Sequence, residues 1–402
     1  MPVPTLHRAC LSRVLLLALL VCIQASNGLA QAATQEWQAR AVLKHPDLRV
    51  PNSALNQQFV AAVAARRQSN PGFFTDPRWP LLLADELAPP PAVASPPPIP
   101  SPDPVSSPSV ASAPLTAEYD AGTLPAGLGL TSAKFRWWSP AETQVVGVLV
   151  LLEGRGGDSR PMVKQAEWQA LAARTHFALM GAHLVNPPDD LYTFQGDPNG
   201  QISDLLDKAA KTLLDKTGQK LKDPPLAFWG HSAGGNITQQ YMSRHANRVA
   251  GAVLMRATGG PGGLAPGKDE VPTLICVGGK DKPDWVKAAL ANYEAGHTTR
   301  ATWTLALNAS EGHEVGRTQA LAVTYLLAAI ERRLPSAHST GSNLDPGPAG
   351  PLKRLDKQAG WLGDPNTFEV AEYSKYPGKK QDAVWLLDET TARAWQTYQR
   401  PL

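Results

Sequence analysis

Ser232 lies in the sequence Gly-His-Ser-Ala-Gly-Gly (230–235), between an apolar run, residues 226–229, and a segment that begins with Asn236. The apolar run predicts a short buried strand, and the segment after the serine predicts a helix. A serine on the sharp turn between a strand and a helix carries its hydroxyl at the top of a sheet, where small neighbours leave it accessible. The pattern predicts a nucleophilic serine, and the alternative is a glycine-rich turn whose serine caps the helix.

Asp281 and His313 lie much later in the chain and are suited to activate such a serine. Asp281 follows the apolar stretch 273–277, and His313 follows the stretch 301–307. A serine hydroxyl is a weak nucleophile at neutral pH, so it needs a base that takes its proton and a carboxylate that fixes the tautomer of that base. We therefore predict Ser232 as the nucleophile, His313 as the general base and Asp281 as its carboxylate partner.

Neighbouring residues offer alternatives for two of these roles. Asp284 lies three residues after Asp281, but its place before a predicted helix favours a capping role. His231 directly precedes Ser232, and as the second residue of the turn its side chain should point away from the serine hydroxyl. A histidine beside a glycine, as His313 is, is often an ordinary surface residue, but here three placements agree in order and in context.

The order of Ser232, Asp281 and His313, each after a predicted strand, resembles the α/β-hydrolase fold over about residues 130–335. The resemblance implies an α/β protein in which a mostly parallel central sheet has helices on both faces. It also implies that two backbone N–H groups bind the oxyanion of a tetrahedral intermediate. The first of these is the N–H of Ala233, the residue after the nucleophile.

The second N–H group is expected in the loop that follows the apolar run 145–152. The chain is similar to the secreted polyhydroxybutyrate depolymerase and feruloyl esterase group, which carries a His-Gly pair in this loop. Here the sequence is Glu153-Gly154-Arg155, so Glu153 replaces the histidine. The matching glycine makes the N–H of Arg155 the expected second donor.

Two arginines and one tyrosine are candidates for substrate binding. Arg155 and Arg256 both follow predicted central strands, where open α/β sheets bind their ligands, and a guanidinium group suits an acidic acyl or sugar group. The alternative is that Arg155 pairs with Glu153 or Asp158 and that Arg256 pairs with a loop carboxylate. Tyr192, in a polar loop, is assigned to substrate binding together with Arg256.

Between residues 115 and 335, predicted strands and helices alternate, which indicates a catalytic domain built on a mostly parallel sheet with both faces covered. The predicted strands are 135–138, 145–152, 177–184, 226–229, 249–255, 273–277 and 301–307. Helices are predicted after Ser159, which is suited to cap the first turn, at 202–214, after Ser232, after Pro283 and at 315–334. The glycine-rich segment 258–263 lacks helical periodicity, so no large helical cap is expected.

The remaining segments have the composition of appendages. Residues 1–32 carry two arginines, an apolar run and small residues, which is typical of a signal peptide and predicts a secreted or periplasmic protein. Residues 33–87 predict a docking segment too small to fold alone, and 88–114 and 336–350 predict linkers rich in Pro, Ala, Ser or Gly. Residues 351–402 are rich in aromatics and are expected either to bind carbohydrate or to pack on the catalytic domain.

Composition excludes several other classes of protein. The 402 residues carry a net charge of +3, so neither a nucleic-acid surface nor a membrane patch is expected, and the N-terminal apolar run is too short for a membrane span. Loss of the signal peptide would leave Cys276 alone, and we expect it to be a buried structural thiol. The nine histidines lack ligand spacing and no glycine string has dinucleotide-binding spacing, so neither a metal nor a cofactor is expected.

Together these residues predict an exported serine hydrolase that cleaves small or polymer-borne carboxylic esters through an acyl-enzyme on Ser232. A peptidase of the same fold is the first alternative. The second is a non-catalytic carbohydrate-binding module whose working surface is the aromatic C-terminal segment.

Overall fold

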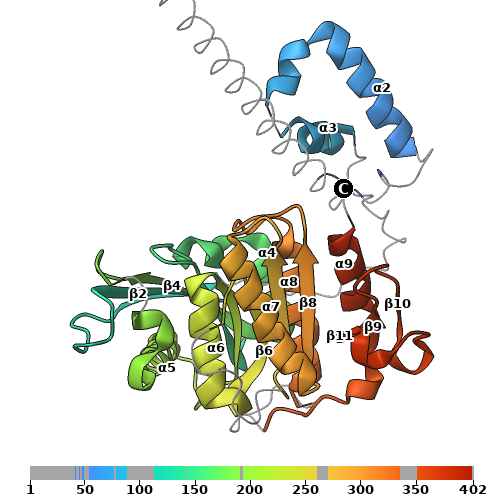
Figure 1. Ribbon diagram of the computed structural model, residues 1–402. Helices are drawn as coiled ribbons and strands as arrows, with labels where there is room; N and C mark the ends of the chain where they lie inside the picture. The colour runs from blue at the N-terminus through green and yellow to red at the C-terminus, as the bar shows by residue number, and fades with distance from the viewer. Residues whose placement is uncertain are drawn as a thin grey trace, which may run out of the picture. The chain divides into compact units, whose positions relative to one another are not determined.

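The computed structural model describes residues 41, 45, 48, 54–76, 78–87, 113–141, 143–190, 193–259, 270–335 and 351–400. The chain divides into two compact units, residues 1–107 and 108–402. Their helices and strands are drawn in Figure 1. The predicted signal peptide, nearly all of the first predicted linker and the whole of the second lie outside the described residues.

The described part of the first unit consists mainly of α2 (Ala54–Ser69), the 3-10 helix η2 (Pro71–Thr75) and α3 (Trp79–Leu87). Aromatic contacts hold these helices together, since the Trp79 ring lies 6.1 Å from the Phe59 ring and 4.9 Å from the Phe74 ring. Arg66 of α2 forms an ion pair with Glu86 of α3 at 2.5 Å. Docking of this segment on the catalytic domain stays a prediction.

Within the described residues of the second unit, eight strands form one sheet in the order β1-β2-β4-β3-β5-β6-β7-β8. β2 pairs antiparallel with β1 and with β4, and all neighbours from β4 to β8 are parallel. The strands are β1 (Leu115–Asp120), β2 (Ser132–Ser139), β3 (Gly147–Leu152), β4 (Phe177–Val185), β5 (Leu226–His231), β6 (Val249–Met255), β7 (Thr273–Gly278) and β8 (Trp303–Asn308).

Helices cover both faces of this sheet (Figure 1). α4 and α8 pack on one face, where Trp168 and Tyr325 are fully buried, and α5, α6 and α7 pack on the other, where Ile202 and Tyr241 are fully buried. None of the helices in the described part of the chain combines the length and the apolar character that a bilayer span requires. The helices are η3 (Arg160–Lys164), α4 (Ala166–Thr175), η4 (Thr193–Gly196), η5 (Pro198–Gly200), α5 (Gln201–Lys216), α6 (Ala233–His245), η6 (Ala246–Arg248), α7 (Pro283–Thr298) and α8 (Thr318–Arg333).

The burial of the strands follows from these layers. Every residue of β3, β6 and β7 is buried, because a strand covered on both faces has no solvated side. β1, at the edge of the sheet, alternates half-buried and exposed residues. The predicted α/β architecture, a mostly parallel sheet between helices, is confirmed.

The predicted capping role of Ser159 is wrong. Its hydroxyl donates to the carbonyl of Leu151 at 2.6 Å and accepts the N–H of Ala182 at 2.8 Å, so it joins the carboxyl ends of β3 and β4. The short helix η3 follows directly, and α4 begins only at Ala166. The Ser159 hydroxyl bonds to the backbone of both strands because buried backbone N–H and C=O groups need hydrogen-bond partners.

Residues 351–400 form a small sheet in the order β10-β9-β11 and a helix, α9. Figure 1 shows them beside β8, where Trp395 Nε1 donates to the carbonyl of Leu305 at 2.6 Å and Thr304 Oγ1 donates to the carbonyl of Trp385 at 2.7 Å. Because Trp385, Trp395 and Tyr398 are buried, these three rings are core residues and present no face to a sugar. The elements are η9 (Lys357–Ala359), β9 (Trp361–Gly363), β10 (Val370–Glu372), η10 (Tyr373–Lys375), η11 (Lys380–Asp382), β11 (Val384–Leu386) and α9 (Glu389–Gln399).

Candidate active site

Ser232 occupies the turn between β5 and α6, with φ 51° and ψ −116°. A residue other than glycine at such a positive φ carries strain of about 1–3 kcal/mol, and a nucleophile elbow imposes this strain on its serine. Gly234 lets α6 start this close to the sheet, because a Cβ at that position would lie 2.3 Å from the carbonyl oxygen of Leu152. The Ser232 N–H donates to the carbonyl of Met255 at 2.8 Å, which fixes the turn to the end of β6.

His313 and Asp281 come from two other strand ends and meet at Ser232. His313 follows β8, and its Nε2 lies 2.8 Å from Ser232 Oγ. Its Nδ1 lies 2.5 Å from Asp281 Oδ2, in the loop after β7. A carboxylate only accepts hydrogen bonds, so Nδ1 carries the ring proton and Nε2 is left to accept the serine hydroxyl. The structure brings these three side chains into the arrangement that proton removal from Ser232 requires.

The alternative carboxylate, Asp284, is placed elsewhere. It is exposed in the first turn of α7, a helix that begins after Lys282. A negative charge in the first turn of a helix is stabilised by the helix dipole. Asp281, by contrast, has a side chain only 6% exposed and accepts the N–H of Lys282 at 2.7 Å. The loop after β7 therefore presents Asp281, and not Asp284, to His313.

Trp285 is a neighbour of His313 that the sequence analysis missed. The two rings lie 4.8 Å apart at an angle of 56°, and the Lys282 ammonium stands 4.1 Å from the centre of the Trp285 ring. The tryptophan therefore limits the access of water to one side of the imidazole. The sequence does show an aromatic residue four positions after the expected acid. The direction of the Trp285 side chain, however, depends on the residue at which α7 starts.

The two expected oxyanion donors belong to segments that meet at Ser232. Ala233 is the first residue of α6, and the first N–H groups of a helix have no partner within it. On the other side, the loop after β3 passes so close that a Cβ at Gly154 would lie 3.7 Å from Ser232 Oγ. The N–H of Arg155, the next residue, remains the predicted second donor.

Glu153 and His231 form a pair behind this loop. Glu153 Oε2 lies 3.0 Å from His231 Nδ1 and accepts the N–H of Gly154 at 3.2 Å. His231 Nε2 lies 2.8 Å from the carbonyl oxygen of His313, which can only accept, so this nitrogen donates. The expected orientation of His231, away from the serine hydroxyl, is what the structure has. The pair joins the oxyanion loop to the backbone of His313.

The charge of Glu153 gives this pair a pH dependence. Burial by itself would raise the pKa of Glu153, but the hydrogen bond and the charge of His231 and the N–H of Gly154 together hold the pKa below its usual value. A carboxyl group whose pKa is lower in the folded state binds more protons when unfolded. Its stabilising contribution is therefore complete above the ordinary glutamate pKa and is lost as the pH falls through the lowered value.

Glu153→Gln is accordingly expected to lower Tm by about 2–4 °C at pH 7, and the difference from the native chain should shrink below pH 4.5. Thermal unfolding followed by circular dichroism between pH 3 and 8 measures this. Glu294→Gln, at an exposed position in the interior of α7, is the matched control and should leave Tm unchanged. A Tm difference that is constant over the whole pH range would contradict the assignment.

Two of the candidates for substrate binding, Arg155 and Tyr192, differ in what the structure describes of them. Arg155 is exposed, and no hydrogen bond or ion pair joins its side chain to any described residue. Its two predicted partners are engaged elsewhere, since Glu153 pairs with His231 and Asp158 with Arg160. A role for Arg155 toward an acidic substrate group stays a prediction. Tyr192 lies outside the described residues.

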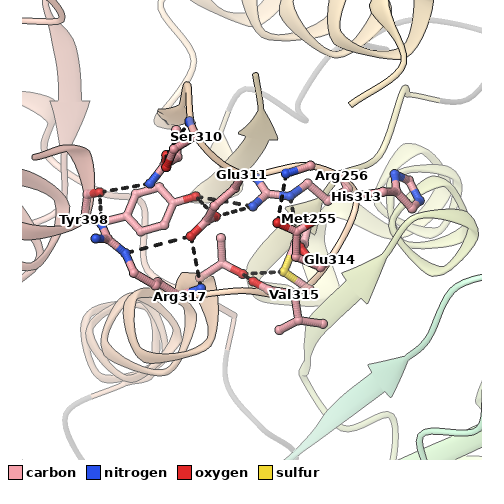
Figure 2. A network of polar contacts seen from close by, with 12 residues as sticks. Met255, Arg256, Ser310, Glu311, His313, Glu314, Val315, Arg317 and Tyr398 are labelled. Carbon is pink, nitrogen blue, oxygen red and sulfur yellow. Dashed lines mark hydrogen bonds and ion pairs between the residues drawn. The ribbon is translucent and has the colours of Figure 1, made fainter. Parts of the chain in front are cut away.

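The prediction that Arg256 binds substrate is wrong. Its side chain is fully buried and forms an ion pair with Glu311, so the predicted alternative, a loop carboxylate, is its partner. Arg256 directly follows β6 and has a positive φ of 52°. Its guanidinium points toward the loop that carries His313 (Figure 2). A buried guanidinium that is already paired has no contact with a substrate.

A small cavity of about 10 Å³ lies beside the loop after β3. This volume has room for about one water molecule. It is lined by Leu152, Glu153, Gly154, Gly157, Ala182, Leu184, Phe194 and Ile237. The cavity next to the expected oxyanion loop therefore has both polar and apolar groups in its walls.

Cys276 does not take part in this site. It lies on β7, fully buried, and burial raises the pKa of its thiol to about 12, so the thiol stays protonated near neutral pH. Among the residues that the structure describes, no group of three His, Cys, Asp or Glu side chains is arranged to hold a metal ion.

A family model of the α/β hydrolase fold matches residues 148–290, which run from β3 through the serine turn into α7. The match and the sheet described above agree in the part of the chain that carries Ser232 and Asp281. The chain has the α/β-hydrolase fold. No curated protein sequence matches it.

Solved structures to which this chain is similar include three hydrolases. A ferulic acid esterase is 10% identical with a TM-score of 0.41, over 54% of this chain and 98% of that one. A fluorophosphonate-binding serine hydrolase of Staphylococcus aureus is 13% identical with a TM-score of 0.39, over 54% and 99% of the two chains. A poly(aspartic acid) hydrolase of a Sphingomonas species is 16% identical with a TM-score of 0.35, over 53% and 98%.

Proposed function

We propose that this α/β hydrolase is a serine esterase that hydrolyses carboxylic esters through an acyl-enzyme on Ser232. The observation that carries the proposal is the continuous contact from Ser232 Oγ through the His313 ring to the Asp281 carboxylate, at 2.8 and 2.5 Å. A serine so placed is activated by a base that is itself oriented by a carboxylate. Esters are chosen over amides because the sequence resembles a group of secreted esterases.

In the first half of the reaction, Ser232 Oγ attacks the ester carbonyl carbon while its proton moves to His313 Nε2. The negative charge that develops on the carbonyl oxygen is stabilised by the N–H groups of Ala233 and Arg155. When the tetrahedral intermediate collapses, the bond to the alcohol oxygen breaks and His313 gives the proton to the departing alcohol. Asp281 stabilises the imidazolium between these two transfers.

In the second half, water attacks the acyl-enzyme and gives a proton to His313. Collapse of the second intermediate returns that proton to Ser232 and releases the carboxylic acid.

Labelling with a fluorophosphonate probe tests the activated serine. The purified chain is expected to become labelled, and Ser232→Ala and His313→Ala are expected to remain unlabelled at the same probe concentration. Circular dichroism of each variant controls for folding. An unlabelled native chain, beside a control hydrolase that reacts, would refute the serine hydrolase. Matched p-nitrophenyl esters and p-nitroanilides given to one preparation then separate an esterase from a peptidase.

We further propose that the esterase acts outside the cytoplasm. The support is the pattern of residues 1–32, with basic residues before an apolar run and small residues after it. Fractionation of producing cells, with the N-terminal sequence of the recovered protein, checks this part. Recovery in the cytoplasm with residue 1 intact would refute it.

A further inference from the structure

The loop between β8 and α8 presents His313, and Glu311 is its anchor. Glu311 precedes His313 by two residues, and its side chain is only 10% exposed. Its carboxylate accepts from Arg256 and from the N–H of Arg317 at 3.2 Å. Gly316, at φ 54°, leaves room for the anchor, because a Cβ there would lie 3.0 Å from the carboxyl carbon of Glu311. The loop is thus folded around a buried carboxylate.

Arg256 holds this loop on both sides of His313. Its guanidinium donates to the Glu311 carboxylate before the histidine and to the carbonyl of Glu314 after it, at 3.3 Å for the second contact. The backbone N–H of Arg256 donates to the carbonyl of Cys276 at 2.8 Å, so the arginine is fixed to β7 of the large sheet. Figure 2 shows Arg256 between Glu311 and Glu314, with the His313 ring directed away from this network.

The other side of the anchor belongs to the C-terminal helix α9. Tyr398 donates its hydroxyl to Glu311 Oε2 at 2.8 Å, on the oxygen that Arg256 also contacts (Figure 2). Burial raises the pKa of Tyr398, so its hydroxyl keeps the proton that it donates. The Tyr398 carbonyl accepts in turn from Arg317 and, at 3.4 Å, from Asn308 Nδ2. One residue of the C-terminal segment therefore binds the start, the anchor and the end of the histidine loop.

We propose that residues 351–400 are a positioning element of the esterase site: Tyr398 holds Glu311, and Glu311 together with Arg256 holds the loop that presents His313 to Ser232. Tyr398 is a positioning residue, since it acts through Glu311 and touches neither His313 nor Ser232. The inference rests on the proposed function for its effect on rate. Its structural content, that Tyr398 orders the loop, is independent of the reaction.

The geometry explains why such an anchor matters for the rate. The imidazole of His313 must hold two contacts at the same time. Its Nε2 lies 2.8 Å from Ser232 Oγ, and its Nδ1 lies 2.5 Å from Asp281 Oδ2. The imidazole is carried by a loop, and misplacement of a reacting group by about 1 Å can cost about a hundredfold in rate. Side chains that support such a group from behind therefore affect turnover without touching the substrate.

Tyr398→Phe tests the inference, because it removes one hydroxyl and keeps the buried ring. We expect kcat for p-nitrophenyl esters to fall roughly tenfold and KM to change by less than about twofold, since substrate binding is untouched. Tyr373→Phe is the matched control, since Tyr373 lies in the same C-terminal segment but outside this network. It should behave as the native chain.

Hydrogen exchange measured by mass spectrometry gives a readout without substrate. In Tyr398→Phe, the amides of residues 309–317 are expected to exchange about threefold to tenfold faster, while those of β3 and β6 stay protected. Tyr373→Phe should leave the loop unchanged. Glu311→Gln, combined with Tyr398→Phe, should lose little more activity than the more impaired single variant, because both act through one contact.

The outcomes separate this inference from the proposed function. An active native chain with a Tyr398→Phe variant that matches Tyr373→Phe in kcat and in loop exchange would overturn the positioning role. A native chain without esterase activity would refute the proposed function, and loop exchange alone would then decide the inference. Unchanged exchange in Tyr398→Phe overturns it in that case as well.

Discussion

Substituting His313 by Ala is expected to lower kcat for ester hydrolysis by about 10⁶-fold, and Asp281→Asn by about 10⁴-fold. The alanine removes the only base in contact with Ser232 Oγ among the described side chains. The asparagine keeps the volume but can donate to His313 Nδ1, which favours the tautomer that cannot accept the serine proton. Initial rates with p-nitrophenyl esters at saturating substrate measure both effects.

Asp284→Asn is the matched control for these substitutions. It changes a carboxylate three residues away that lies exposed on α7, and we expect kcat to stay within about twofold of the native value. The reverse result, with Asp284→Asn more damaging than Asp281→Asn, would mean that the wrong carboxylate has been assigned to His313.

Trp395→Ala is expected to lower the free energy of unfolding by about 4 kcal/mol. The ring is fully buried between the small sheet and β8, packs edge-on against Phe368 at 6.1 Å, and donates to the carbonyl of Leu305 at 2.6 Å. Its removal leaves a large cavity and an unpaired strand carbonyl. Urea denaturation followed by far-UV circular dichroism measures the change.

Trp361→Ala provides the comparison within the same segment. Trp361 is only half-buried, with the Arg393 guanidinium 5.6 Å from its ring centre, so its loss should cost less than about 2 kcal/mol. Equal losses for the two substitutions would show that the C-terminal segment does not share the core of the catalytic domain.

The sequence was sufficient for the elements that have a strong local signal. β6 was predicted with its observed bounds, and β3 and β7 within two residues, because a strand buried on both faces is a continuous apolar run. The turn at Ser232 was predictable because the glycines around it are needed for close backbone approach. The small C-terminal sheet escaped prediction, since its three-residue strands are too short to show a period.

The side chains around the site were harder to predict than the fold. Arg256 was expected at the substrate because it follows a central strand, but its direction is set by a positive φ and by Glu311, 55 residues later. Glu153 and His231 are 78 residues apart, and nothing in either local sequence indicates that they pair. Spacing along the chain predicts which strand end carries a residue, and only packing decides where its side chain points.

The position of β8 in the large sheet gives residues 351–400 a second consequence. β8 is the last strand in the order of that sheet, and an open edge strand offers its backbone groups to strands of other molecules. In this structure the Trp395 indole N–H donates a hydrogen bond to the carbonyl of Leu305 on β8. The Thr304 hydroxyl, also on β8, donates to the carbonyl of Trp385 on β11. The segment therefore blocks edge-to-edge association at β8, and a chain that lost it would aggregate through that strand.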